Sequence, residues 1–243
     1  MNVLSLFSGI GGLELGLERA GMTTVGQVEI DPHCRQILAK HWPEVPQHDD
    51  VRSAIDWWRR ELRPAVDVVC GGFPCQDLSN ARTNGARPGL DGDKSGLWNA
   101  YRDVVAHLEP RWVVVENISA WERWVSRVRS DLHGLGYASV PLQLSAGSFG
   151  APHKRPRVLV VAHPYGEGES LRAFYEEVAG LRPVPRGGGH WGSSQPGAVR
   201  VADGVPDRMD MPRLKALGNA VVPAVAEFVG RLILEADALR GVA

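Results

Sequence analysis

The sequence places reactive side chains at the ends of short apolar runs. Cys75 lies in the segment GGFPCQ after one such run, and a cysteine thiolate at the carboxyl edge of a parallel sheet is suited to nucleophilic attack. Glu116 ends the run WVVVE, where burial raises the pKa of a carboxyl group and favours a role as proton donor. Arg155 and Arg157 alternate in the segment HKRPR, so in an extended chain their side chains point the same way. These residues predict a site with a nucleophile, an acid and positive charge.

The segment FSGIGG, residues 7–12, forms a glycine-rich turn between an apolar run and a helical stretch. Glycines let the backbone turn tightly and approach a ligand at the helix N-terminus. Glu14 occupies the third glycine position of the dinucleotide fingerprint GxGxxG, which argues against pyrophosphate binding. Glu29 ends the next run and could accept hydrogen bonds from ribose hydroxyls, and Asp49 or Asp50 could meet an adenine amino group. The pattern indicates a nucleoside-containing ligand, although each acid alone is also typical of the solvated end of an element.

The reactive residues can lie close together only if the buried strands that precede them end at one edge of a sheet. Short runs rich in β-branched residues predict strands at residues 3–7, 24–30, 66–70, 112–115 and 158–162. The stretches between and after them predict helices at residues 13–20, 32–41, 55–62, 97–108 and 223–239. Because the runs are continuously apolar, both faces of the strands should be buried, which predicts an α/β fold with a mainly parallel sheet. Ligands of such sheets bind at the carboxyl ends of the strands.

The composition is that of an ordinary globular protein. Hydrophobic residues make up 44% of the 243 residues and charged residues 23%, and 27 Lys+Arg are balanced by 28 Asp+Glu. This balance argues against a protein that coats nucleic acid through bulk charge, but it leaves a local basic face open. No apolar run approaches the roughly 20 residues of a membrane span, and no signal peptide is recognisable, so we expect a cytoplasmic protein. The 3 cysteines lack zinc-type spacing and predict no metal site; Cys34 and Cys70 fit buried structural thiols.

Five motifs follow one another in a recognisable order: FxGxGG at residues 7–12, PCQ at 74–76, EN at 116–117, KRxR at 154–157 and GNAVVP at 218–223. In this order the sequence resembles the C5-cytosine-specific DNA methyltransferase family, of bacterial or phage type, over about residues 3–228. The resemblance implies a Rossmann-like class I S-adenosylmethionine-dependent methyltransferase fold with a mainly parallel seven-stranded sheet. It also implies a catalytic and cofactor-binding domain at residues 1–162, a very small, loop-rich target-recognition region at 163–211, and a C-terminal motif and helix at 212–243 that pack back onto the catalytic domain.

The resemblance also implies residue roles. The residues expected to bind S-adenosylmethionine are Phe7, Gly9, Ile10, Gly11, Gly12, Glu29, Ile30, Asp50, Val51, Pro74, Leu97, Asn219 and Val221. In the family's reaction, Cys75 would add to carbon 6 of cytosine, Glu116 would hydrogen-bond or protonate N3, and Arg157 would contact O2. Arg155 is grouped with these catalytic residues and is expected to orient the loop or a phosphate.

The target cytosine must be reached from the face of its ring, so the resemblance implies that the base is flipped out of duplex DNA. The residues expected to contact DNA are Ser79, Arg82, Arg87, Arg186 and His190. Residues 150–215 carry ten basic and seven acidic side chains, a net charge of +3, which leaves −4 for the remainder. The loop at residues 182–191 is the candidate for entering a groove, and an ordinary surface loop is the alternative interpretation.

The leading hypothesis is a DNA cytosine-5-methyltransferase that modifies one cytosine within a specific duplex sequence. We expect a monomer whose partner is double-stranded DNA, and a restriction endonuclease encoded nearby is a further candidate partner. The alternatives are the tRNA-methylating branch of the same family and a catalytically idle DNA-binding relative, although intact Cys75, Glu116 and Arg157 speak against the idle relative. An NAD-type Rossmann enzyme would bind nicotinamide, and Glu14 counts against it.

Overall fold

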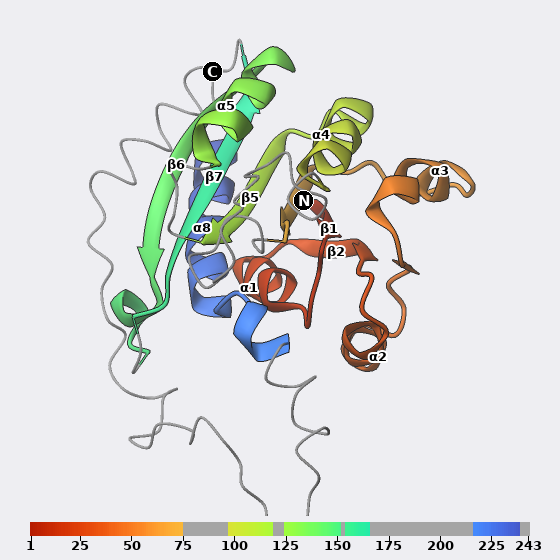
Figure 1. Ribbon diagram of the computed structural model, residues 1–243, viewed down its shortest axis with the longest axis horizontal. Coiled ribbons are helices and arrows are strands. Elements are labelled where there is room, and N and C mark those ends of the chain that lie inside the picture. The colour runs from red at the N-terminus through yellow and green to blue at the C-terminus, as the bar shows by residue number, and fades with distance from the viewer. Residues whose placement is uncertain (75–96, 119–123, 152–153, 166–215, 239–243) are drawn as a thin grey trace, which may run out of the picture.

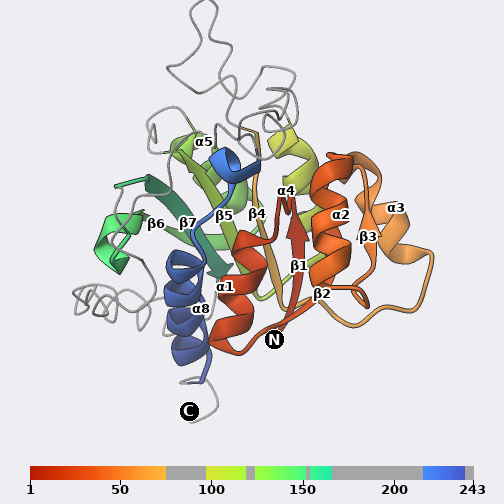
Figure 2. The same cartoon turned by 90° about the horizontal axis from the view of Figure 1, so that it is seen from below.

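The computed structural model describes residues 1–74, 97–118, 124–151, 154–165 and 216–238. These residues form one seven-stranded sheet with helices on both faces (Figures 1 and 2). The strands are β1 (Asn2–Leu6), β2 (Thr23–Val28), β3 (Gln47–His48), β4 (Val68–Gly72), β5 (Trp112–Ile118), β6 (Tyr137–Ser145) and β7 (Pro156–Pro164). The helices are α1 (Gly12–Ala20), α2 (Pro32–His41), α3 (Ala54–Arg59), α4 (Leu97–Leu108), α5 (Val125–Gly134) and α8 (Pro223–Ala238), with short 3-10 turns η1 (Val51–Ser53) and η4 (Ala146–Phe149).

The strand order in the sheet is β3-β2-β1-β4-β5-β7-β6. Strands β3, β2, β1, β4 and β5 pair in parallel, whereas β7 runs antiparallel to both β5 and β6. The predicted mainly parallel, seven-stranded sheet is therefore confirmed. The chain proceeds outward from β1 to β2 and β3 and then returns to β4. This makes the carboxyl ends of β1 and β4 the topological switch point, where ligands bind in folds of this kind.

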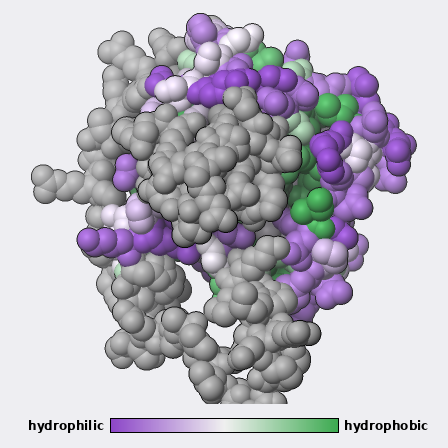
Figure 3. Space-filling model, viewed as in Figure 1, coloured by the Kyte–Doolittle hydropathy of each residue, from purple (hydrophilic) through white to green (hydrophobic). Residues whose placement is uncertain are grey.

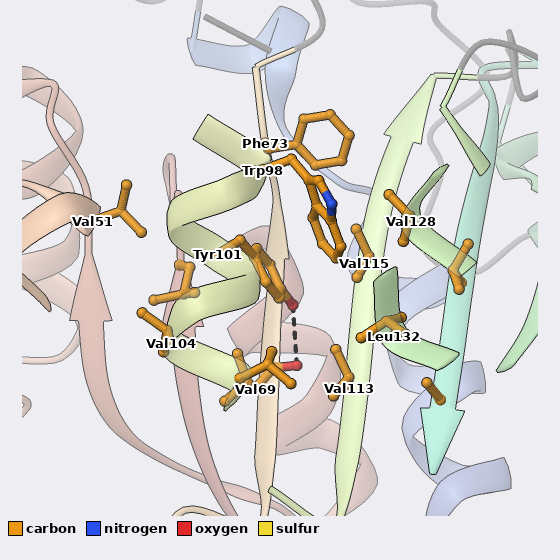
Figure 4. Close-up of a cluster of buried hydrophobic side chains, with 14 of the residues drawn as sticks. Val51, Val69, Phe73, Trp98, Tyr101, Val104, Val113, Val115, Val128 and Leu132 are labelled. Carbon is orange, nitrogen blue, oxygen red and sulfur yellow. Dashed lines mark hydrogen bonds between the residues drawn. The ribbon is translucent and has the colours of Figure 1, made fainter. Parts of the chain in front are cut away.

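Alternate side chains of the central strands enter two separate cores, which explains why their apolar runs are continuous. In β5, Val113 and Val115 pack in the core beneath α4 and α5, and Trp112 and Val114 pack in the core beneath α1 and α8. Figure 4 shows the first of these cores, with Tyr101 projecting from α4. Each side chain buried in this way stabilises the fold by about 1.5–3 kcal/mol. The described surface visible in Figure 3 is mostly hydrophilic, as expected when the apolar side chains fill the interior.

Helices α1 and α8 lie side by side on one face of the sheet (Figure 2). Gly16 permits this close contact, because a Cβ atom there would lie 2.4 Å from both the carbonyl oxygen of Pro223 and the Cβ of Ala226. Among the described residues, Ala216–Ala238 is the one stretch long and apolar enough to span a membrane by length and composition. Its apolar side chains enter the core beneath α1 and α8, which accounts for that composition; they include Val225, Val229, Leu232 and Ile233.

The structure adds two strands that the apolar runs did not predict. β3 has only two residues, and β6 is a partly buried edge strand that contains Pro141, a residue that edge strands tolerate. β7 ends at Pro164, beyond the predicted end at residue 162, and the helix predicted at residues 55–62 ends at Arg59. Most of the predicted target-recognition region lies outside the described residues.

Candidate active site

The turn after β1 has a backbone conformation that favours glycine. The φ angle is 56° at Gly9 and 85° at Gly11, and Gly11 is the N-cap of α1. The Gly11 N–H donates to the carbonyl of Ser8 at 3.0 Å, which closes the turn. The Trp42 ring packs against Gly11, since a Cβ atom at Gly11 would lie 2.4 Å from it, and its indole N–H donates to Glu18 at 2.7 Å. Trp42 therefore fixes the turn from the α2 side, a contact that sequence spacing did not reveal.

Glu29 follows β2 and lies against this glycine turn. The residue is 9% exposed, and its carboxylate accepts hydrogen bonds from the backbone N–H groups of Gly9 and Asp31, both at 2.7 Å. The next residue, Ile30, is 65% exposed, which is unusual for a large apolar side chain. The structure thus brings Glu29 together with the glycine turn and leaves an apolar side chain exposed next in the chain. This combination suits a ligand that presents both hydroxyl groups and an apolar ring.

The C-terminal motif reaches the start of α1. A Cβ atom at Gly12 would lie 2.3 Å from the backbone oxygen of Val221, so only glycine permits this approach. Val221 is buried at 8% exposure, and Asn219, two residues earlier, is exposed. Two segments from opposite ends of the sequence therefore meet at the glycine turn, and both carry predicted cofactor residues.

Three other predicted cofactor residues have structural partners of their own. Phe7 stacks on Tyr101 with ring centroids 6.5 Å apart. Asp50 caps η1 and pairs with Arg52 at 2.6 Å, and this guanidinium group lowers the pKa of Asp50. Val51 is 5% exposed in the core beneath α4 and α5, so its side chain has a packing role. The remaining predicted cofactor residues are partly buried: Ile10, Pro74 and Leu97.

Glu116 lies in β5 beside Gly72 of β4. The residue is 6% exposed, and its Oε1 lies 3.0 Å from Nε of Arg157 on β7. Burial raises the pKa of Glu116 to about 7, because the nearby positive charges of Arg157 and Arg155 offset the loss of solvation only in part. Gly72 makes room for the carboxyl group, since a Cβ atom there would lie 2.5 Å from Oε2. The raised pKa expected from the sequence therefore has a structural basis, and the group can hold a proton near neutral pH.

Arg155 differs from the sequence-based expectation. The residue has φ 39°, in the left-handed region, so the predicted regular extended geometry is wrong at this position. Its guanidinium group donates to the carbonyls of Leu217, Gly218 and Ala220 at 3.3, 2.6 and 2.7 Å. Arg157 instead pairs with Glu116, so the two arginines bind different partners. Arg155 joins the C-terminal motif to the segment that carries Arg157.

The residue before Pro74 is anchored from several sides. Phe73 is 2% exposed, and its ring packs against Trp98 and Trp124 with centroids 5.9 and 5.8 Å away (Figure 4 shows Phe73 and Trp98). Its carbonyl accepts a hydrogen bond from the Asn117 side chain at 3.0 Å. Asn117 follows Glu116 directly, so one dipeptide supplies both the buried acid and the anchor for the end of β4. Sequence reasoning placed Asn117 in a motif but did not identify this contact.

Several predicted site residues lie outside the described residues, namely Cys75, Ser79, Arg82, Arg87, Arg186 and His190. The described chain reaches Pro74, which follows β4 at the same edge of the sheet as Glu116. Within the described parts of the chain, no group of three or more His, Cys, Asp or Glu side chains could hold a metal ion. Cys34 and Cys70 are buried there, as expected of structural thiols.

Comparison with known families agrees with this geometry. Residues 1–178 match the model of the C-5 cytosine-specific DNA methylase family. The chain belongs to this family. The curated relatives include the type II methyltransferase M2.BsuMI of Bacillus subtilis, 40% identical over 171 residues (67% of this chain and 42% of the relative). They also include the type II methyltransferase M.Eco47II of Escherichia coli, 33% identical over 166 residues (66% of this chain and 39% of the relative).

Solved structures support the same family fold. A prophage-encoded protein of E. coli described as a DNA modification methyltransferase is 26% identical, with a TM-score of 0.55, over 71% of this chain and 48% of that protein. The Entamoeba histolytica methyltransferase EhMeth matches over 97% of this chain and 98% of its own, with a TM-score of 0.64, and at 17% identity it shows the fold alone. The chain spans about two fifths of the length of the two curated relatives described above.

Proposed function

We propose that this C-5 cytosine-specific DNA methylase family member transfers a methyl group from S-adenosylmethionine to carbon 5 of a cytosine in duplex DNA. The observation that carries this proposal is Glu116, a buried acid paired with Arg157 beside the strand that leads into Pro74 and Cys75. An acid with a raised pKa, a guanidinium group and a nearby nucleophile are what attack on a cytosine ring requires.

The residues around the glycine turn fit the proposed cofactor. S-adenosylmethionine would supply an electrophilic methyl group on a positively charged sulfur, and it has a ribose and an adenine but no pyrophosphate. Glu29 offers a carboxylate beside the turn, and Ile30 offers an exposed apolar side chain. Gly12 and Val221 bring the C-terminal motif against the turn, where Asn219 and Val221 would close the cofactor site.

The proposed reaction uses the described residues to make the cytosine ring reactive. The Cys75 thiolate adds to carbon 6, while Glu116 gives a proton to N3 and Arg157 donates a hydrogen bond to O2, so the charge that develops on the ring is neutralised. Carbon 5 then becomes nucleophilic and takes the methyl group. Loss of the proton from carbon 5, departure of the Cys75 sulfur from carbon 6 and return of the N3 proton to Glu116 restore the aromatic ring. The cytosine must leave the duplex for this attack.

The remaining predicted roles complete the proposal. Arg155 would position the C-terminal motif through the carbonyls that it binds. Ser79, Arg82, Arg87, Arg186 and His190 stay as predicted DNA contacts. Duplex DNA is the proposed partner of a monomeric cytoplasmic enzyme, and the type II names of the relatives make a restriction endonuclease a candidate second partner.

A duplex that carries 5-fluorocytosine tests the covalent mechanism. Fluorine at carbon 5 cannot leave as a proton, so the enzyme, the cofactor and the duplex should form an adduct that survives denaturing electrophoresis. We expect this adduct with the wild type and none with Cys75→Ser. The absence of an adduct with the wild type, or an adduct that persists in Cys75→Ser, would refute the mechanism. A parallel incubation with labelled cofactor and tRNA separates this function from tRNA methylation.

A further inference from the structure

A carboxylic acid is completely buried beneath the glycine turn, and the proposed reaction does not use it. Glu14 lies in the first turn of α1, two residues after Gly12, and its exposure is 0%. Neither of its carboxyl oxygens makes a hydrogen bond of normal geometry with a described residue. A buried carboxylate without a compensating charge is strongly disfavoured, whereas a neutral carboxylic acid is tolerated.

The polar groups around Glu14 are hydroxyls, a thiol and another acid. The hydroxyls of Ser5 in β1 and Ser8 in the turn lie near enough to lower its pKa, and the Glu18 carboxylate on α1 raises it. Cys70 of β4 is also buried, and the Glu14 charge contributes to the raised pKa of its thiol. Burial has the largest effect, and the pKa of Glu14 rises to about 7.

No cation among the described residues offsets this burial. The effects on the pKa of Glu14 come from burial, the backbone, two hydroxyls and one carboxylate, and none comes from an arginine, lysine or histidine. Helix α8 packs on α1 through small and apolar groups, with Pro223 and Ala226 against Gly16. Burial and the Glu18 carboxylate therefore outweigh the backbone and the two hydroxyls, and the protonated acid is favoured.

Ser8, whose hydroxyl group lowers the pKa of Glu14, is held in the glycine turn by three hydrogen bonds. The Ser8 hydroxyl donates to the Ser5 carbonyl at 3.3 Å, the Ser8 N–H donates to Val28 at 3.0 Å, and the Ser8 carbonyl accepts from Gly11 at 3.0 Å. Ser8 thus bonds to β1, to the end of β2 and to the rest of the turn. A proton on Glu14 places a hydrogen-bond donor beside this junction, and loss of the proton places an unpaired negative charge there.

We propose that Glu14 is a positioning residue that acts as a neutral acid, and that loss of its proton displaces the glycine turn and weakens cofactor binding. This inference rests on the proposed function, because it takes S-adenosylmethionine as the ligand of the turn. The proton is exchanged with solvent, and no other bond changes. The cofactor affinity of this protein should therefore decrease as the pH rises through neutrality.

Calorimetric titration with S-adenosylmethionine tests the proposal between pH 6 and pH 8.5. The variants are Glu14→Gln, which mimics the neutral acid, and Glu235→Gln, a matched control at an exposed glutamate of α8. The ratio of the wild-type Kd to the Glu14→Gln Kd should lie near 1 at pH 6 and rise by up to about 30-fold at pH 8.5, as the protonated fraction falls. Glu235→Gln should follow the wild type. A ratio that stays constant with pH would overturn the proposal.

A second measurement, of folding stability against pH, tests the neutral state of Glu14 without any cofactor. Because the pKa is raised in the folded state, the native protein binds more protons than the unfolded chain between the two pKa values, so stability should fall as pH rises. Urea denaturation gives the unfolding equilibrium constant of each protein. The ratio of the wild-type constant to the Glu14→Gln constant should rise by roughly two orders of magnitude between pH 4 and pH 8. A flat ratio would overturn the neutral-acid assignment. A different outcome is that the wild type and the variants all fail to bind S-adenosylmethionine while the ratio of unfolding constants still rises with pH. In that case the proposed function is refuted, and the assignment of Glu14 as a neutral buried acid is kept.

Discussion

Gly72→Ala should displace the buried acid of the candidate site without replacing any residue that takes part in the proposed reaction. The new Cβ atom would lie 2.5 Å from Oε2 of Glu116, whereas ordinary contacts begin near 3.4 Å. The carboxyl group must therefore move by about 1 Å, and it must do so while it is paired with Arg157. A misplacement of that size in a catalytic group costs about 10²-fold in rate, or about 2.7 kcal/mol of transition-state stabilisation.

The assay is single-turnover transfer of labelled methyl groups to duplex DNA at saturating cofactor. We expect Gly72→Ala to lower the transfer rate by about 10²-fold and to leave the Kd for S-adenosylmethionine almost unchanged, because the three atoms nearest the new Cβ all belong to Glu116. Gly134→Ala is the matched control, since a Cβ atom at Gly134 meets nothing within 4 Å. A transfer rate for Gly72→Ala within about threefold of the control would show that the position of Glu116 does not limit the reaction.

Three further changes have distinct expected outcomes. Gly12→Ala places a Cβ atom 2.3 Å from the backbone oxygen of Val221, so it should separate the C-terminal motif from the glycine turn and raise the Kd for the cofactor by at least about tenfold in calorimetry. Since burial raises the pKa of Glu116 to about 7, the protonated donor is lost above that pH, and the ratio of the wild-type rate to the Glu116→Gln rate should fall by about tenfold per pH unit in a pH profile. Asn117→Ala removes the hydrogen bond to the Phe73 carbonyl and should lower the 5-fluorocytosine trapping rate while the protein stays folded by circular dichroism. An unchanged Kd would contradict the expectation for Gly12→Ala, and a ratio of rates that does not change with pH would contradict that for Glu116→Gln. An unchanged trapping rate would contradict the expectation for Asn117→Ala.

The sequence predicted the central part of the fold because its signals are local. The run at residues 112–115 is apolar at every position, and the structure buries alternate side chains in two cores, which is the environment that such a run indicates. β6 was not predicted, because it is an edge strand that is only partly buried and contains Pro141, so it lacks a continuous apolar run. β3 is held by two residues of pairing, too few to produce any periodic signal.

The candidate site was predictable where function depends on residue type, and unpredictable where it depends on packing. Glu29 follows β2 and Glu116 lies near the end of β5, so the sequence located both acids, and their roles stay predictions. Trp42 contacts the glycine turn from α2, and no spacing rule relates the end of one helix to the N-cap of another. Arg155 was expected to share the geometry of Arg157, but a single positive φ angle changes its partners, and local sequence does not specify that angle.

Bisulfite sequencing of DNA from a methylation-free host that expresses this chain tests the central claim most directly. The proposed function predicts that cytosines within one sequence context resist conversion, and that Cys75→Ser abolishes this resistance. Complete conversion of all cytosines in cells that contain the folded wild-type protein would contradict the claim, as would equal resistance with Cys75→Ser.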